Sequence, residues 1–239
     1  MTLMIAARPS PNHGPRPADA VIDMVILHYT GMPTAAEALD RLCSAEAGVS
    51  AHYLVEETGE IWRLVAEEQR AWHAGLSFWA GRRDINDCSI GIELVNPGHD
   101  WGYRPFPEAQ MAALEELCRG ILARHPIPAR HVLGHSDVAP RRKQDPGELF
   151  DWPRLARAGI GLWPDFAAAP PGTADLAALQ RRLGMIGYEI PDPGANDDDA
   201  VRAAIAAFQR HFRPGRCDGV ADAETCGRAA AVAAACATP

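Results

Sequence analysis

The 239-residue sequence lacks any apolar run near the ~20 residues that a membrane-spanning helix requires. It also lacks an excess of basic residues, because 31 acidic residues outnumber 23 basic ones and the formal net charge is −8. Such a surface repels phosphate backbones, so we expect no nucleic-acid partner. Met1 to Ala7 are too few for the apolar core of a secretory signal and run into Arg8-Pro9. We therefore expect no membrane span and a cytoplasmic location.

Cysteine is sparse: six residues form no CxxC pair and no dense framework. This spacing excludes a small disulfide scaffold and favours free thiols that pack as small apolar groups. Cys217 and Cys226 are near enough in sequence to pair, and spacing alone does not decide their oxidation state. Apolar residues make up 47% and charged residues 23%, the balance of a globular protein with a buried core.

The first 160 residues alternate between strand and helix patterns. Residues 1–20 contain four prolines and predict an extended lead, whereas the β-branched run Val21–Leu27 predicts a strand covered on both faces. Further strands are expected over 51–56, 61–65, 89–95 and 130–133, and helices over 34–45 and 107–124. We therefore predict an α/β (α+β) domain over 21–162, with a mixed central β-sheet flanked by helices.

A linker and a small helical domain follow. Consecutive prolines within 163–174 indicate the linker, and apolar residues at helical spacing from Leu176 onward predict a helical domain over 175–236. The acidic tract Asn196–Asp199 lacks the ligand spacing of a calcium loop. It is better explained as a helix N-cap with first-turn charge.

Two of the nine histidines stand where predicted strands end. His28 closes the first strand, and His135 follows Gly134 after the last one. Ligand and catalytic groups collect where strands give way to loops. Either histidine alone suggests a structural residue, but the two together, with carboxylates nearby, indicate a metal. A catalytic zinc site needs about three protein ligands and one open position.

Three carboxylates are candidates for the third ligand: Asp137, Asp145 and Glu93. Asp145 lies in a Pro/Gly-bounded loop ten residues after His135, long enough to return to the same ion, whereas Asp137 is close enough to point away. His131 and His135 have the spacing of a helical metalloprotease pair. That motif requires glutamate directly after the first histidine and a helical segment, and this segment offers neither.

Glu93 interrupts the apolar strand Ser89–Val95. Strand alternation places it on the face opposite Ile90, Ile92 and Leu94. Because a buried carboxylate is costly unless it is paired or chemically employed, two interpretations stay open. Glu93 either forms an ion pair with an arginine or acts as a general base beside a zinc-bound water.

Six short segments, in order along the chain, carry a family resemblance. They are Leu27–Thr30, Ser50–Val55, Trp72–Gly75, Asn86–Glu93, Gly134–Asp137 and Arg142–Gly147. Together they resemble the type-2 zinc N-acetylmuramoyl-L-alanine amidases, a family that includes bacterial peptidoglycan-recycling amidases and shares its fold with animal peptidoglycan recognition proteins. The resemblance spans about residues 20–160.

This resemblance implies a site and a reaction. Zinc would be held by His28, His135 and Asp145, with Glu93 and Lys143 as the catalytic pair. The reaction would be hydrolysis of the amide between N-acetylmuramic acid and L-alanine in peptidoglycan or its (anhydro)muropeptides, for wall turnover or recycling.

One departure and one group of loop residues refine the site. The similar phage lysozyme branch carries a catalytic tyrosine where this sequence has Ala51, which favours Glu93 as the base. The loop before the Glu93 strand supplies candidate substrate-groove residues, although core packing explains Trp79 equally well. These residues are Trp72, His73, Trp79 and Asn86.

The tail resembles the common three-helix peptidoglycan-binding domain. The matching residues are Leu179-Gln180, Leu183, Gly187-Tyr188, Ala207–Gln209, Asp218-Gly219 and Thr225. A wall-binding tail suits an enzyme in the periplasm or at the cell wall, which is the alternative to a cytoplasmic location. The tail is also able simply to cover the sheet domain. We expect a monomer with peptidoglycan or a muropeptide as its partner.

Two other function classes stay open at this point. A non-catalytic peptidoglycan-recognition protein has the same fold, but it would be expected to have a broken ligand set. A metallopeptidase acting on the stem peptide would break a different bond, which the masses of the products reveal.

Overall fold

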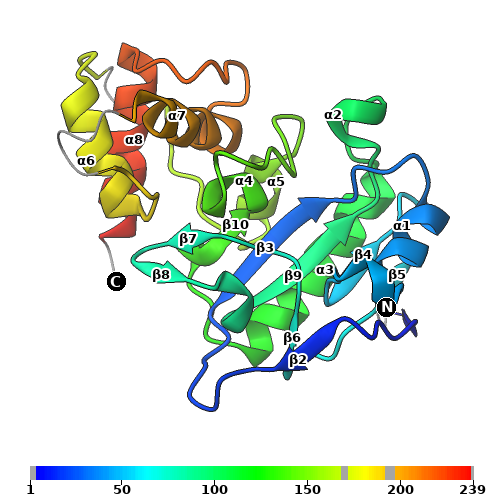
Figure 1. Ribbon diagram of the computed structural model, residues 1–239. Helices are drawn as coiled ribbons and strands as arrows, with labels where there is room; N and C mark the ends of the chain where they lie inside the picture. Colours follow the sequence, from blue (N-terminus) through cyan, green and yellow to red (C-terminus); the bar gives the residue numbers. More distant parts are fainter. Residues whose placement is uncertain (1–3, 168–171, 192–196, 238–239) are drawn as a thin grey trace.

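A six-stranded mixed sheet forms the centre of the computed structural model, which describes residues 4–167, 172–191 and 197–237 (Figure 1). Only β4 and β5 are antiparallel neighbours, and every other adjacent pair is parallel. This confirms the predicted fold class. In sheet order the strands are β1 (Ile5–Ala7), β5 (Ile61–Arg63), β4 (Tyr53–Val55), β9 (Ser89–Leu94), β3 (Met24–Tyr29) and β10 (Val132–Gly134).

Two short ribbons and several helices complete the first part of the chain. The proline-rich lead is extended and contributes both β1 and β2, which joins β6. The ribbons are β2 (His13–Pro15) with β6 (Gln69–Ala71), and β7 (Phe78–Trp79) with β8 (Arg82–Arg83). The helices are α1 (Ala35–Leu42), α2 (Gly98–Trp101), α3 (Glu108–Arg124), α4 (His135–Val138) and α5 (Trp152–Arg157), with 3-10 turns at Ala45–Ala47, Ile85–Asp87 and Ala129–His131.

The two faces of the sheet are covered differently. Alternate residues of β3 and β9, such as Leu27 and Ile92, pack against the apolar stripe of α3. On the opposite face, α1 packs on Leu54 of β4, and the C-terminal helices pack on Met24 and Ile26 of β3. The central part of this second face, at the carboxyl ends of the strands, lies between these two coverings.

The C-terminal segment folds into three helices, α6 (Leu176–Ile186), α7 (Asp198–Phe212) and α8 (Ala223–Cys236), which gather beside α4 and β10 (Figure 1). Their apolar side chains form one continuous cluster with Met24, Ile26 and Leu133 of the sheet. Asp197 caps α7 by accepting the Ala200 N–H at 3.1 Å, as the acidic tract predicted. Residue 196 of that tract and residues 168–171 of the predicted linker lie outside the described residues.

Two details of the sequence prediction are decided by the structure. The last strand begins at Val132, because after Pro128 the chain closes a 3-10 turn in which the His131 N–H donates to the Pro128 carbonyl at 2.8 Å. All six cysteines are free, so Cys217 and Cys226 do not pair. None of the helices in the described ranges combines the length and the apolar character needed to span a bilayer.

Glu67 ties the end of α3 to β4. Its carboxylate accepts hydrogen bonds from Tyr53 Oη, Arg124 Nη2 and His125 Nε2, each at 2.7 Å. Burial alone would raise the pKa of Glu67, but these three donors lower it to about 2. The ionised carboxylate therefore stabilises the fold on which the site is built.

We expect Glu67→Gln to flatten the dependence of the unfolding free energy on pH. A carboxyl whose folded-state pKa is depressed contributes stability that is complete above its unfolded value of 4.5 and is lost as the pH falls towards about 2. Glutamine keeps an acceptor but does not titrate. Urea unfolding of both proteins at about pH 6 and about pH 3 measures the two slopes. Equal slopes would contradict this role.

Candidate metal centre and active site

A cleft of about 370 Å³ opens at the carboxyl ends of the central strands. It brings together all five residues for which the sequence implied a metal-binding or catalytic role, and two of the four groove residues. The lining includes His28, Glu93, His135, Lys143 and Asp145, together with Trp72 and His73.

Strand register explains why these residues meet. His28 of β3 is paired with Glu93 of β9, and Leu27 is paired with Gly134 of β10. Paired residues of parallel neighbours point to the same face, so Glu93 stands beside His28, and His135 emerges next to it at the start of α4. The Asp145 loop returns to the same point, where its carbonyl accepts the Ser136 N–H at 2.9 Å.

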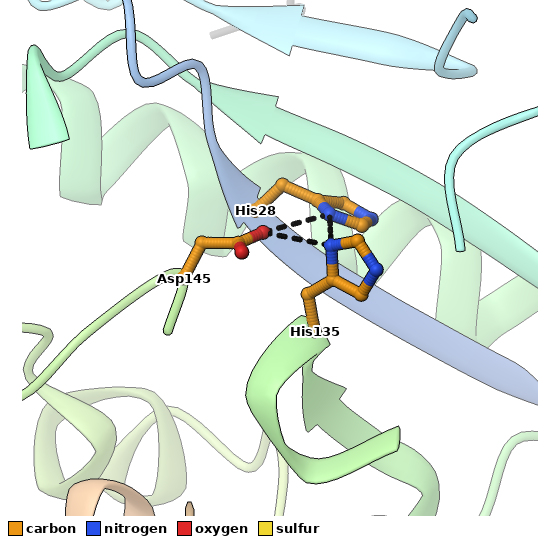
Figure 2. Close-up of side chains that lie close together, drawn as sticks. All are labelled: His28, His135 and Asp145. Atoms are coloured by element: carbon orange, nitrogen blue, oxygen red, sulfur yellow. Dashed lines mark hydrogen bonds and ion pairs between the residues drawn. The ribbon is translucent and has the colours of Figure 1, made fainter. Parts of the chain in front are cut away.

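Three buried atoms form a tight triangle (Figure 2). His28 Nδ1 lies 2.9 Å from His135 Nδ1, and each lies 3.0 Å from Asp145 Oδ2. His28 comes from the end of β3, His135 from the first turn of α4 and Asp145 from the loop that follows (Figure 2). All three residues are at most 6% exposed.

The hydrogen bonds behind the triangle determine where the imidazole protons lie. His135 Nε2 is 3.1 Å from the Ala74 carbonyl, which only accepts, so Nε2 carries the proton of that ring. In a neutral ring Nδ1 then presents a bare electron pair to the triangle.

The His28 ring is held by a longer chain of the same kind. Ser89 Oγ donates to the Ile85 carbonyl at 2.6 Å and therefore accepts from His73 Nε2 at 3.2 Å. This leaves His73 Nδ1 as an acceptor for His28 Nε2–H at 3.1 Å. Burial lowers the pKa of His28 to about 4 and the pKa of His73 well below its usual value, so both rings are neutral. His28 Nδ1 is therefore also bare.

In the tautomers that these hydrogen bonds select, three electron pairs converge on one point. Such an arrangement is repulsive on its own and is relieved by a cation at its centre. The residues fit a divalent metal, because neutral imidazole and carboxylate are common ligands of zinc, which leaves one position open in catalytic sites with three protein ligands. Among the described residues, His28, His135 and Asp145 are the side chains of metal-ligand type whose donor atoms lie close enough together to share one ion.

Glu93 is the neighbour without a partner. Its Oε2 is buried and accepts no hydrogen bond, and no ion pair with an arginine is present in the part of the chain that the structure describes. Burial, reinforced by the charge of Asp145, raises the pKa of Glu93 well above its usual value, and Lys143 opposes this shift. The geometry thus favours the base interpretation over the ion pair.

Two of the four predicted groove residues lie outside the cleft lining, and a third also contacts a candidate metal ligand. Trp79 is 1% exposed and packs edge-to-face on Tyr188 of the C-terminal segment, outside the cleft lining. Asn86 is also buried, and its Oδ1 accepts the N–H groups of His73 and Ala74. The His73 ring turns inward to His28. The positions of Trp79 and Asn86 correct their predicted substrate contacts to packing and loop-fixing roles, whereas Trp72 and His73 line the cleft and stay candidate contacts.

Comparison with known proteins shows the family to which the chain belongs. A family model for N-acetylmuramoyl-L-alanine amidases matches residues 18–148, and a model for a peptidoglycan binding domain matches residues 172–228. The chain belongs to the N-acetylmuramoyl-L-alanine amidase family. The resemblance predicted from the six segments and from the tail is confirmed.

Three members of this family illustrate the likeness. AmiD of Escherichia coli is 40% identical over 227 residues, covering 85% of this chain and 79% of AmiD. Its complex with the substrate anhydro-N-acetylmuramic acid-L-Ala-D-gamma-Glu-L-Lys has a TM-score of 0.80 over 91% of each chain. AmpDh3 of Pseudomonas aeruginosa, with anhydromuramic pentapeptide, has a TM-score of 0.77 at 36% identity over 94% of each chain. The 1,6-anhydro-N-acetylmuramyl-L-alanine amidase AmpD of Enterobacter cloacae is 36% identical over 62% of this chain and 86% of its own.

Two features of this amidase-family site were missed in the sequence. Gly91 stands where a Cβ atom would collide with the His73 ring, so the missing side chain makes room for the histidine. Arg142 Nη2 donates to the carbonyls of Ala74 and Leu76 at the cleft rim, so Ala74 O serves both Arg142 and His135. A glycine within an apolar strand is the signal that a close approach occurs there.

We expect His73→Ala to weaken the binding of Zn²⁺ by about 10–100-fold, since His28 loses the acceptor that fixes its ring. Competition with a chromophoric chelator measures the dissociation constant. His13→Ala is the matched control, because His13 is exposed on β2. An unchanged zinc affinity in a folded His73→Ala protein would show that His73 does not orient the ligand.

Proposed function

We propose that this chain is a zinc-dependent amidase that hydrolyses the amide bond between N-acetylmuramic acid and L-alanine in muropeptides. One arrangement carries this function: three bare donor atoms of His28, His135 and Asp145 converge beside the unpaired carboxyl of Glu93. Such a group of ligands next to a base is what metal-assisted hydrolysis of an amide requires.

The chemistry divides between the ion and the protein. When bound, zinc lowers the pKa of a water molecule from 15.7 towards about 7 and polarises the scissile carbonyl. Glu93 accepts a proton from the attacking water at its carboxylate and then delivers it to the departing nitrogen of L-alanine. Its raised pKa suits both steps, because it makes the carboxylate a stronger base than an exposed glutamate.

Lys143 supplies positive charge in the same cleft. It lines the cleft together with Glu93 and His28, and its ammonium group lowers the pKa of both. We assign it the stabilisation of the negative charge that develops on the carbonyl oxygen. By analogy with single oxyanion-hole donors, a group of this kind lowers the barrier by about 3–4 kcal/mol.

The relatives suggest the form of the substrate. The AmiD and AmpDh3 structures hold anhydromuramic peptides, and AmpD is named for the 1,6-anhydro compound. We therefore propose anhydro-muropeptides as the substrate class. The intact His/His/Asp set speaks against a purely recognising protein, and the masses of the products distinguish this reaction from cleavage within the stem peptide.

The cellular setting stays a prediction from the sequence. We keep the cytoplasm as the proposed compartment, with the periplasm or cell wall as the alternative, and a monomer as the proposed state. Cell fractionation, with intact sacculi and soluble anhydro-muropeptide as parallel substrates, tests the compartment.

Glu93→Gln should retain zinc and lose turnover by about 10²–10⁴-fold, because the amide keeps the shape of the side chain but removes the base. Release of the L-alanyl peptide from anhydro-muropeptide, followed by liquid chromatography and mass spectrometry, measures turnover, and elemental analysis measures zinc. Turnover near the wild-type rate with zinc present would remove Glu93 from its assigned role.

Lys143→Met should shift the acidic limb of the pH–rate profile to higher pH as well as lower kcat. Lys143 lowers the pKa of Glu93, so its loss raises that pKa, and the base becomes available only at higher pH. Profiles of kcat/KM on the same substrate measure the shift. Arg141→Met is a control, since Arg141 pairs with Asp197 at an exposed site. A limb that stays in place, or moves to lower pH, would contradict this coupling.

A further inference from the structure

A second buried carboxylate lies on the same helical turn as His135. Asp137 was a candidate metal ligand in the sequence, but it points away from the triangle, as its closeness to His135 suggested, and it is 1% exposed. Its two oxygens accept three hydrogen bonds instead. A buried carboxylate with this many donors is firmly placed.

One of these bonds fixes the start of α4. The Gly134 N–H donates to Asp137 Oδ2 at 2.8 Å, which closes the turn that carries His135. The same turn holds the Asp145 loop through the Ser136 N–H. Asp137 therefore anchors the backbone from which His135 projects and against which Asp145 is placed.

The other two donors come from the C-terminal segment. Tyr188 Oη donates to Asp137 Oδ1 at 2.6 Å, and His211 Nδ1 donates to Oδ2 at 2.7 Å. The His211 ring is itself fixed by stacking between Trp152, at a centroid distance of 3.7 Å, and Phe212, at 4.0 Å. Tyr188 is also buried and packs against Trp79.

We propose that the C-terminal helical segment is part of the scaffold of the metal centre, with Tyr188 and His211 as positioning residues for His135 through Asp137. This inference rests on the metal site proposed above. A family resemblance gives the segment the role of binding the wall. Its contacts here give it a second role inside the catalytic unit, because loss of its two donors leaves Asp137 buried with one bond and frees the turn to shift.

The test uses the full chain with Tyr188→Phe, His211→Phe and the double variant. Each substitution keeps an aromatic ring in place and removes only the donor to Asp137. We expect the zinc dissociation constant of the double variant to rise about tenfold, as for other residues that support metal ligands indirectly. The visible absorption of the Co²⁺-loaded protein, which reports ligand geometry, should change in parallel.

Two further variants separate positioning from general destabilisation. Val232→Ala truncates a buried side chain of α8 in the shared apolar cluster, and valine has no donor for Asp137, so this variant should lower the melting temperature but leave zinc affinity and the cobalt spectrum unchanged. His211→Asn restores an N–H near the position of Nδ1 and should recover part of the affinity.

The outcomes distinguish the two proposals. If wild-type protein binds no zinc, the proposed function fails and this inference fails with it. If wild-type protein binds zinc and the folded Tyr188→Phe and double variants bind it equally well with the same cobalt spectrum, only the positioning role is overturned. A fall in affinity that Val232→Ala reproduces at a matched melting temperature would also overturn it.

Discussion

Three bare donor atoms that face one another within about 3 Å are the constraint on which the rest of this structure depends. Without a cation they repel, so the surrounding protein must hold them against that repulsion. The register of β9, β3 and β10 sets the positions of the side chains, and the backbone of the Asp145 loop closes the triangle. The Ala74 carbonyl and the His73–Ser89 chain then keep protons away from the inward-facing nitrogens.

Several buried polar groups around the triangle have hydrogen-bond partners, but one buried acceptor in the described part of the chain has none. His73, Ser89 and Asn86 each have defined partners, whereas Glu93 Oε2 has none. A buried acceptor without a donor is costly, and such costs concentrate where a group must exchange a proton. The unpaired atom therefore stands where the proposed reaction needs a base.

Much of this site follows from the sequence because its principal residues are tied to strand ends. His28 and His135 follow apolar strands, and parallel neighbours present their carboxyl ends at one edge, so their proximity was predictable. Alternation likewise placed Glu93 on the correct face of β9. The choice of Asp145 over Asp137 was weaker from spacing alone and drew on the family resemblance.

What the sequence does not reveal are contacts between distant segments. His73 was predicted as a groove residue from its place in the loop before the Glu93 strand, and the sequence did not show that its ring packs into the space above Gly91. Trp79 meets Tyr188, and Asp137 meets His211 across 74 residues of sequence. Periodicity and turn signals report local structure, so they do not predict partners of this kind.

The apolar cluster that runs from the sheet into the last three helices bears on how such a chain is able to evolve or be re-engineered. The two parts of the chain share one apolar core, so exchanging residues 172–237 for an unrelated domain would expose Met24, Ile26 and Leu133 to solvent. Successful recombination must therefore carry both halves together or redesign the face between them.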